Sequence, residues 1–293
     1  MCVKGMERMV LWLWLTIVSG ALLGLYDIAK KKALESSSLF CVLALYSLFN
    51  LLFVSYEFPK AIHIDGFSLG IIFIKSLVIF ASWILGFVAI KGLPISIITP
   101  FGTLSPLFTV IMGVTLLGER LGWIQVAGLG LIFASYYFIG KIGTIEITGL
   151  FKNRNLYFMA VAMFLSACSA LIDKVVLKKV TTGQMQFWFS LFVAGLYLAT
   201  LMAMRWKDRE KALIKFSWYI PLMSLLLVVS DRIYFTAVKM PDSTISIIMP
   251  LRKISIIVSA IIGGILFKEK NLRAKFACIC ILLVGIAVEF AGK

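Results

Sequence analysis

The chain has 293 residues, of which 61% are hydrophobic and only 15% charged, and its formal net charge at pH 7 is +15. This is too little polar surface to cover a soluble globule, so the composition indicates an integral membrane protein. The lysines and arginines are spread over short loops and helix ends rather than gathered in one basic region, which argues against nucleic-acid binding. The five cysteines mostly lie in apolar runs, where we expect them to be small buried side chains. The single histidine, His63, lies in a predicted loop. Neither a metal site nor a cofactor is expected.

Ten apolar segments follow one another along the chain, each long enough to cross a bilayer as a helix. The first five cover 9–30, 36–56, 67–90, 94–117 and 121–140, and the second five cover 155–177, 183–205, 217–239, 243–267 and 271–291. The first is too long for the apolar core of a signal peptide and is expected to remain as a span. None alternates as a barrel strand would, so the pattern predicts an all-α polytopic membrane protein with ten transmembrane helices.

A polar linker at 141–154 divides the chain into two sets of five helices, 1–140 and 155–293. The two sets share short motifs at nearly constant offsets. Ser96-Ile-Ile-Thr-Pro100 recurs as Ser246-Ile-Ile-Met-Pro250, Gly113 and Glu119-Arg120 recur as Gly263 and Glu269-Lys270, Ser76 and Ser82 recur as Ser224 and Ser230, and Lys31-Lys32 recur as Lys178-Lys179. Because each set has an odd number of spans, the second enters the membrane from the opposite side. The sequence therefore predicts an inverted repeat, an arrangement that in secondary carriers forms a substrate site near the bilayer midplane.

Two adjacent cations, Arg252 and Lys253, stand near the middle of the ninth segment. On a continuous helix about 35 Å long they lie about 14 Å from its start, which is bilayer depth. One charge there costs at least about 2.5 kcal/mol unless it faces water or a counter-charge. An arginine fork and a lysine together suit an oxyanion, so the pair is the main candidate for substrate binding. The alternative is that one of the two snorkels to the interface or pairs with a carboxylate.

Other charges within the apolar segments allow two interpretations each. Asp231 is a candidate counter-ion for Arg252 or Lys253 and the best candidate for proton coupling, whereas Arg232 is a candidate member of the anion site. Lys75 either snorkels or contributes to binding. Asp173 and Lys174 lie near a helix end, where a local salt bridge or a solvated entrance is expected.

Aromatic and helix-breaking residues complete the set of candidates. Trp83 and Tyr234 lie at nearly equal depths in the third and eighth segments, where they either line the cavity or pack against helices or lipid. Pro100, Pro106 and Pro250 interrupt the fourth and ninth segments and are candidate hinges. Gly20-x-x-x-Gly24 favours close helix packing.

Two five-helix repeats, with Pro100 and Gly118-Glu119-Arg120 in the first and Pro250 and Lys268-Glu269-Lys270 in the second, resemble the EamA-type members of the drug/metabolite transporter superfamily. The resemblance covers essentially the whole chain, although Lys268 departs from the glycine at Gly118. It implies an alternating-access carrier of small organic solutes in the cell's inner membrane, with a cavity between the halves. Phosphate-translocating members carry a lysine-arginine pair on the ninth helix. Arg252-Lys253 is similar in location but reversed in order, which implies a phosphorylated or carboxylated solute.

Several alternatives remain open on sequence alone. An exporter of amino acids or other neutral or zwitterionic solutes is favoured if Asp231 and Asp173 compensate Arg252 and Lys253, and a lipid-handling or scaffold protein is a further alternative. An enzyme is not expected, because no catalytic constellation appears at suitable spacing. Coupling to protons or to a counter-substrate is undecided. Orientation is also open, because the resemblance implies cytoplasmic termini whereas the loop charges favour the opposite side.

Overall fold

The computed structural model describes residues 2–36, 39–92, 104–141, 154–207, 216–266, 280–281 and 283–288. Within these ranges the regular structure is helical and no strand occurs, which confirms the all-α prediction for this part of the chain. The elements, in order, are α1 (Cys2–Ser36), α2 (Leu39–Val54), the 3₁₀ helix η1 (Ser55–Glu57), α3 (Phe58–Ala61), α4 (Gly66–Gly92), α6 (Leu104–Leu116), α7 (Trp123–Lys141), α8 (Arg154–Val176), α9 (Thr182–Lys207), α10 (Tyr219–Lys239), α11 (Ile245–Arg252) and α12 (Ser255–Leu266).

Six helical stretches among the described residues are long and apolar enough to cross a membrane: Leu11–Leu34, Cys41–Ala61, Gly66–Gly86, Arg154–Val176, Thr182–Met204 and Tyr219–Lys239. They coincide with the first, second, third, sixth, seventh and eighth predicted segments. The chain is therefore a multi-pass membrane protein. The fourth segment is described only from residue 104, and most of the tenth lies outside the described residues. The count of ten spans and the inverted repeat stay predictions.

The chain divides into two compact units. The first comprises Met1–Leu77, Asp173–Ser243 and Ile254–Ser259, and the second comprises Val78–Ile172, Thr244–Lys253 and Ala260–Lys293. Three helices, α4, α8 and α12, contribute residues to both units. The predicted linker at 141–154 falls mostly in 142–153, outside the described residues. The division into sequence repeats stays a prediction.

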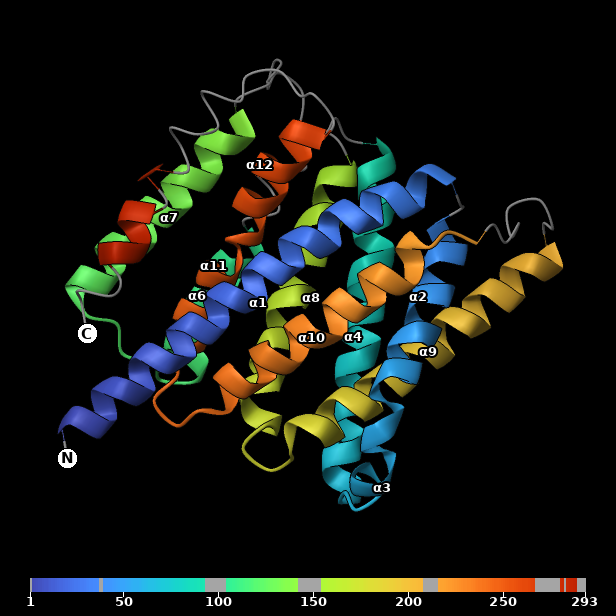
Figure 1. Cartoon of the computed structure of the whole chain (residues 1–293), viewed down its shortest axis with the longest axis horizontal. Helices are drawn as coiled ribbons and strands as arrows, with labels where there is room; N and C mark the ends of the chain where they lie inside the picture. The colour runs from blue at the N-terminus through green and yellow to red at the C-terminus, as the bar shows by residue number, and fades with distance from the viewer. Residues whose placement is uncertain are drawn as a thin grey trace. The chain divides into compact units, whose positions relative to one another are not determined.

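In the first unit, α1 and α10 run side by side, and α2 packs on α9 and α10 (Figure 1). Serine hydroxyls join these helices. The Ser19 hydroxyl donates to the Ser230 carbonyl at 2.9 Å, and the Ser224 hydroxyl donates to the Tyr46 carbonyl at 3.0 Å. Because the hydrophobic effect does not draw helices together in lipid, small residues and inter-helix hydrogen bonds of this kind supply specificity.

Gly24 allows α1 to approach the start of α12 closely. A methyl group at this position would lie 2.6 Å from Cβ of Val258 and 2.7 Å from the carbonyl oxygen of Ser255. Both distances are well inside van der Waals contact, and the second involves backbone that cannot rotate away. Gly24, the second glycine of the predicted packing motif, is therefore required at this contact.

In the second unit, Glu119 stabilises the start of α11. Its carboxylate accepts the backbone N–H groups of Ile245 at 2.7 Å and Ser246 at 2.9 Å, together with the Ser246 hydroxyl. The N-cap residue, Thr244, makes no side-chain cap bond of its own. The carboxylate thus satisfies N–H groups that a helix start leaves without partners, and its charge suits the positive end of the helix dipole. Gly118, at φ 66°, supplies the left-handed turn that places Glu119.

The ninth predicted segment, 243–267, contains two helices, and the interruption between them lies just after Pro250, one of the candidate hinges. The structure has α11 ending at Arg252 and α12 beginning at Ser255, with Lys253 at φ −70° and ψ 2° between them. Pro250 removes one hydrogen bond from the α11 ladder. The N–H of Lys253 bonds to the carbonyl of Pro250, three residues back, which tightens the last turn and ends the helix.

We expect Gly24→Ala to destabilise the protein by about 1–3 kcal/mol, because the added methyl overpacks the contact with Ser255 and Val258. The measurement is the unfolding midpoint in detergent. Gly70→Ala is the matched control, since nothing lies within 4 Å of a methyl group there. That change should be neutral or stabilise α4 by about 0.5–1 kcal/mol. Equal effects of the two substitutions would contradict the close approach.

Glu119→Ala should lower stability by about 2–3 kcal/mol, because it removes charge-assisted hydrogen bonds to the start of α11. Glu119→Gln should lose less, since one oxygen remains to accept an N–H group. The same unfolding measurement applies. Arg120→Ala, at the adjacent exposed position, is the control and should stay within about 0.5 kcal/mol of the parent protein.

Candidate functional site

Lys75 lies on the part of α4 that belongs to the first unit, and only 3% of it is exposed. Its ammonium group is paired inside the protein. Nζ lies 2.7 Å from Oδ1 of Asp173 on α8, and Asp173 is itself only 4% exposed. The contact is therefore a direct ion pair between two buried groups. Of the two interpretations of Lys75, snorkelling is therefore excluded in this conformation.

Tyr234 and two phenylalanines complete the surroundings of this pair. The Tyr234 hydroxyl, on α10, donates to the other carboxylate oxygen of Asp173 at 3.2 Å. Lys75 Nζ lies 3.8 Å from the ring centroid of Phe189 on α9 and 5.1 Å from that of Phe235 on α10. Aromatic faces attract a cation most strongly when it is out of water, as here. We call these five residues, Lys75, Asp173, Tyr234, Phe189 and Phe235, the α4–α8 charge cluster.

Lys174, the residue after Asp173, points to a different partner. Its ammonium donates to the carbonyls of Val238 at 3.1 Å and Ser243 at 2.6 Å, and to the Ser243 hydroxyl. It therefore ties α8 to the end of α10 and the turn that follows. The local salt bridge expected between Asp173 and Lys174 is not what the structure contains, because adjacent helical residues point about 100° apart.

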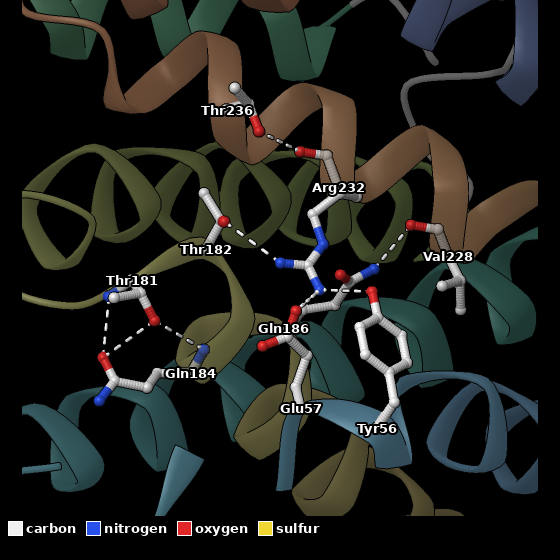
Figure 2. Close-up of polar contacts among 9 residues, drawn as sticks. All are labelled: Tyr56, Glu57, Thr181, Thr182, Gln184, Gln186, Val228, Arg232 and Thr236. Atoms are coloured by element: carbon white, nitrogen blue, oxygen red, sulfur yellow. Dashed lines mark hydrogen bonds and ion pairs between the residues drawn. The ribbon is translucent and has the colours of Figure 1, made fainter. Parts of the chain in front are cut away.

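Arg232 lies in a second polar cluster of the first unit, shown in Figure 2. Its guanidinium makes an ion pair with Glu57 of η1 at 2.5 Å and donates to the Tyr56 hydroxyl at 2.8 Å and to the Thr182 hydroxyl at 3.3 Å. Glu57 can occupy this position because Gly183 has no side chain; a methyl group on Gly183 would collide with the Glu57 carboxylate. The cluster fastens α10 to η1 and the start of α9. The charge of Arg232 is thus matched by Glu57, and an anion site at Arg232 stays a prediction.

Arg252 and Lys253 are both half-buried at the interruption between α11 and α12. Arg252 is the last residue of α11, where a cation favourably faces the negative end of the helix dipole. The two cations thus lie at a backbone break rather than on a continuous apolar helix. Their role in substrate binding, with Asp231 as counter-ion, stays a prediction.

The remaining sequence candidates fall at separate positions. Asp231 is half-buried on α10, and Trp83 is half-buried on the part of α4 that belongs to the second unit. Pro106 is the third residue of α6, where no intrahelical hydrogen bond is lost, and Pro250 lies inside α11. Pro100 lies outside the described residues. Among the residues described, no group of three or more histidine, cysteine or acidic side chains could hold a metal ion.

Sequence reasoning missed Asp173 and Glu57 as partners. Both had a usable signal, because a lone carboxylate in or beside an apolar helix must be matched to a cation elsewhere. Which cation each would meet was not readable from the order of residues, since Lys75 and Asp173 are 98 positions apart.

Comparison with known proteins gives a match to one family model over part of the chain and matches to solved structures. Residues 10–141 match the model of the EamA-like transporter family. No curated protein sequence matches the chain. A solved protein crystal structure superposes with a TM-score of 0.71 at 16% sequence identity, over 95% of this chain and 94% of the other. At that identity the likeness shows a shared fold and nothing further.

Lys75→Met should destabilise the protein by about 3–5 kcal/mol, because it leaves the carboxylate of Asp173 buried without its counter-charge. Lys75→Met combined with Asp173→Asn should recover most of that loss, since no unpaired charge remains. Unfolding midpoints of the two single variants, the double variant and Lys178→Met, an exposed lysine, test this. A double variant as unstable as the sum of the singles would contradict the pairing.

Proposed function

We propose that this chain is a secondary transporter that moves a small organic solute across a membrane by alternating access. The match of residues 10–141 to the EamA-like transporter family is the observation that carries the proposal. Six membrane-spanning stretches among the described residues are consistent with it. So is the α4–α8 charge cluster, because ionisable groups inside spanning helices mark substrate or ion pathways by default.

The proposed architecture is ten helices arranged as two inverted repeats, in the cell's inner membrane. A matched pair of hydrogen bonds supports the repeat. The hydroxyls of Ser19 and Ser230 lie 3.1 Å apart, and those of Ser82 and Ser166 lie 2.8 Å apart. Ser19 and Ser166 differ by 147 positions, like Lys31 and Lys178, and Ser82 and Ser230 differ by 148. The first pair joins α1 to α10 and the second joins α4 to α8, as a two-fold relation between the repeats requires.

The proposed substrate is an anionic metabolite, either phosphorylated or carboxylated, bound by Arg252 and Lys253. The interruption beside them supports this, because broken helices in transporters place backbone groups and side chains at the substrate. A fork of guanidinium donors gives bidentate contacts to an oxyanion, and an adjacent ammonium adds charge.

The zwitterion alternative needed Asp173 as one of the counter-charges for Arg252 and Lys253. Asp173 is instead engaged by Lys75 and Tyr234 in the first unit. This favours the anionic class over the exporter of neutral or zwitterionic solutes. Partners beyond the solute and the lipid bilayer are a coupling proton or a counter-substrate.

Thermal-shift screening of the purified protein against phosphorylated metabolites, carboxylates and amino acids tests the proposal. We expect one anionic class to stabilise the protein. Arg252→Ala should weaken that binding by roughly 10- to 100-fold, because hydrogen bonds to charged groups contribute about 1.5–3 kcal/mol. Lys253→Ala should weaken it as well, and Lys178→Ala should leave it unchanged. Stabilisation by amino acids alone, or unchanged anion binding in both variants, would assign the pair a structural role.

A further inference from the structure

An ion pair is not the only way in which a buried place between helices can be filled. Replacing a buried ion pair with well-packed apolar residues is commonly neutral or stabilising. The repeat itself offers the comparison: at the offsets of 148 and 147, the counterparts of Lys75 and Asp173 are Met223 and Tyr26. Both counterparts are buried, with 1% and 4% exposure, and neither carries a charge. The same place in the other half is thus filled by uncharged side chains.

The groups that face Asp173 come from two other helices, α4 and α10. Lys75 approaches from α4 and the Tyr234 hydroxyl from α10. Asp231, three residues before Tyr234 on α10, adds a second negative charge that acts on Asp173. Lys174 on α8 is turned away to Ser243. The ammonium of Lys75 is therefore the cation in direct contact with the carboxylate.

The charges of Lys75 and Asp173 determine which kind of ligand can bind beside them. The ammonium and the carboxylate together are neutral, so an anion that joins Lys75 leaves one uncompensated negative charge in a buried place, which is strongly unfavourable. A proton on Asp173 leaves Lys75 as the one charged member of this contacting pair, and its single positive charge matches a monovalent anion. Lys75 remains held in that state, because Phe189 lies 3.8 Å from its ammonium and does not depend on the carboxylate.

The pair joins two helices within the first unit. Lys75 lies two residues before the point where α4 passes from the first unit to the second, and Asp173 is the first residue of α8 in the first unit. The pair holds these two helices together where both leave the first unit. Protonation of Asp173 removes the attraction that joins them.

We propose that the Lys75–Asp173 pair is a proton–anion coupling site, in which one proton binds the Asp173 carboxylate while one oxyanion takes its place beside the Lys75 ammonium. The proton comes from bulk water and forms an O–H bond on the carboxylate, and Lys75 stays protonated throughout. This inference rests on the proposed transport function. It names a coupling ion and assigns the carboxylate to Asp173 rather than to Asp231.

The test uses lactate and methanesulfonate as probes, because both are monovalent oxyanions whose charge does not change between about pH 5.5 and 8.5. Affinity is measured with the full-length protein in lipid nanodiscs at several pH values. In the parent protein, affinity should rise up to tenfold for each unit of falling pH, as expected when one proton binds with each anion. Asp173→Asn should bind at least tenfold more tightly than the parent at the highest pH, without pH dependence. Lys75→Met should lose the pH-dependent part of this binding.

The two members of the pair thus have opposite predicted effects, which a merely structural salt bridge would not produce. Asp65→Asn, at an exposed carboxylate before α4, is the control and should leave the pH dependence unchanged. Equal losses in Asp173→Asn and Lys75→Met, an unchanged pH slope in Asp173→Asn, or no binding of either probe to Asp173→Asn would overturn the inference.

A second measurement needs no variant. Adding either anion to the parent protein in weakly buffered solution should take up one proton per anion bound, recorded with a pH indicator. Anion binding without proton uptake would overturn the inference. If Arg252→Ala abolishes anion binding while Asp173→Asn changes nothing, the transport proposal stands and the coupling site falls.

Discussion

Charges on helices that cross a bilayer must be neutralised within the protein, and in the first unit this requirement decides which helices meet. Lys75 and Asp173 join α4 to α8 across an ion pair of 2.7 Å. Arg232 and Glu57 join α10 to the short helix η1. Lys174 joins α8 to the turn after α10 through backbone carbonyls. An apolar surface alone would not select these neighbours, because lipid solvates it as well as another helix does.

The second unit uses a different device at its most constrained point. There the carboxylate of Glu119 accepts the backbone N–H groups at the start of α11. This fixes the start of a short helix that contains Pro250. This helix has eight residues and ends at Arg252, two residues after Pro250, and it does not continue into α12. The two units thus differ in where they hold charge, and this asymmetry supports distinct roles for the Lys75–Asp173 pair and for Arg252 with Lys253.

Much of the helical layout was predictable, because six spanning segments can be recognised by their length and apolar composition. The candidate site was predictable only in part. Lys75 and Tyr234 were recognised as unusual residues in apolar helices, but their common partner Asp173 was assigned a local role. The error has a simple cause: sequence distance favours neighbours such as Lys174, whereas helix geometry turns adjacent side chains apart.

The sequence by itself determined the membrane class, the position of the long spans and the presence of ionisable residues that need partners, since all three depend on composition and periodicity. Tertiary structure alone decided the pairings, because Lys75 meets Asp173 and Arg232 meets Glu57 only once α4, α8, α10 and η1 are packed. It also decided the exact place, at Lys253, where the ninth segment breaks after Pro250. The outcome there depends on the backbone conformation after Pro250, and hydropathy, which averages over about 20 residues, does not register it.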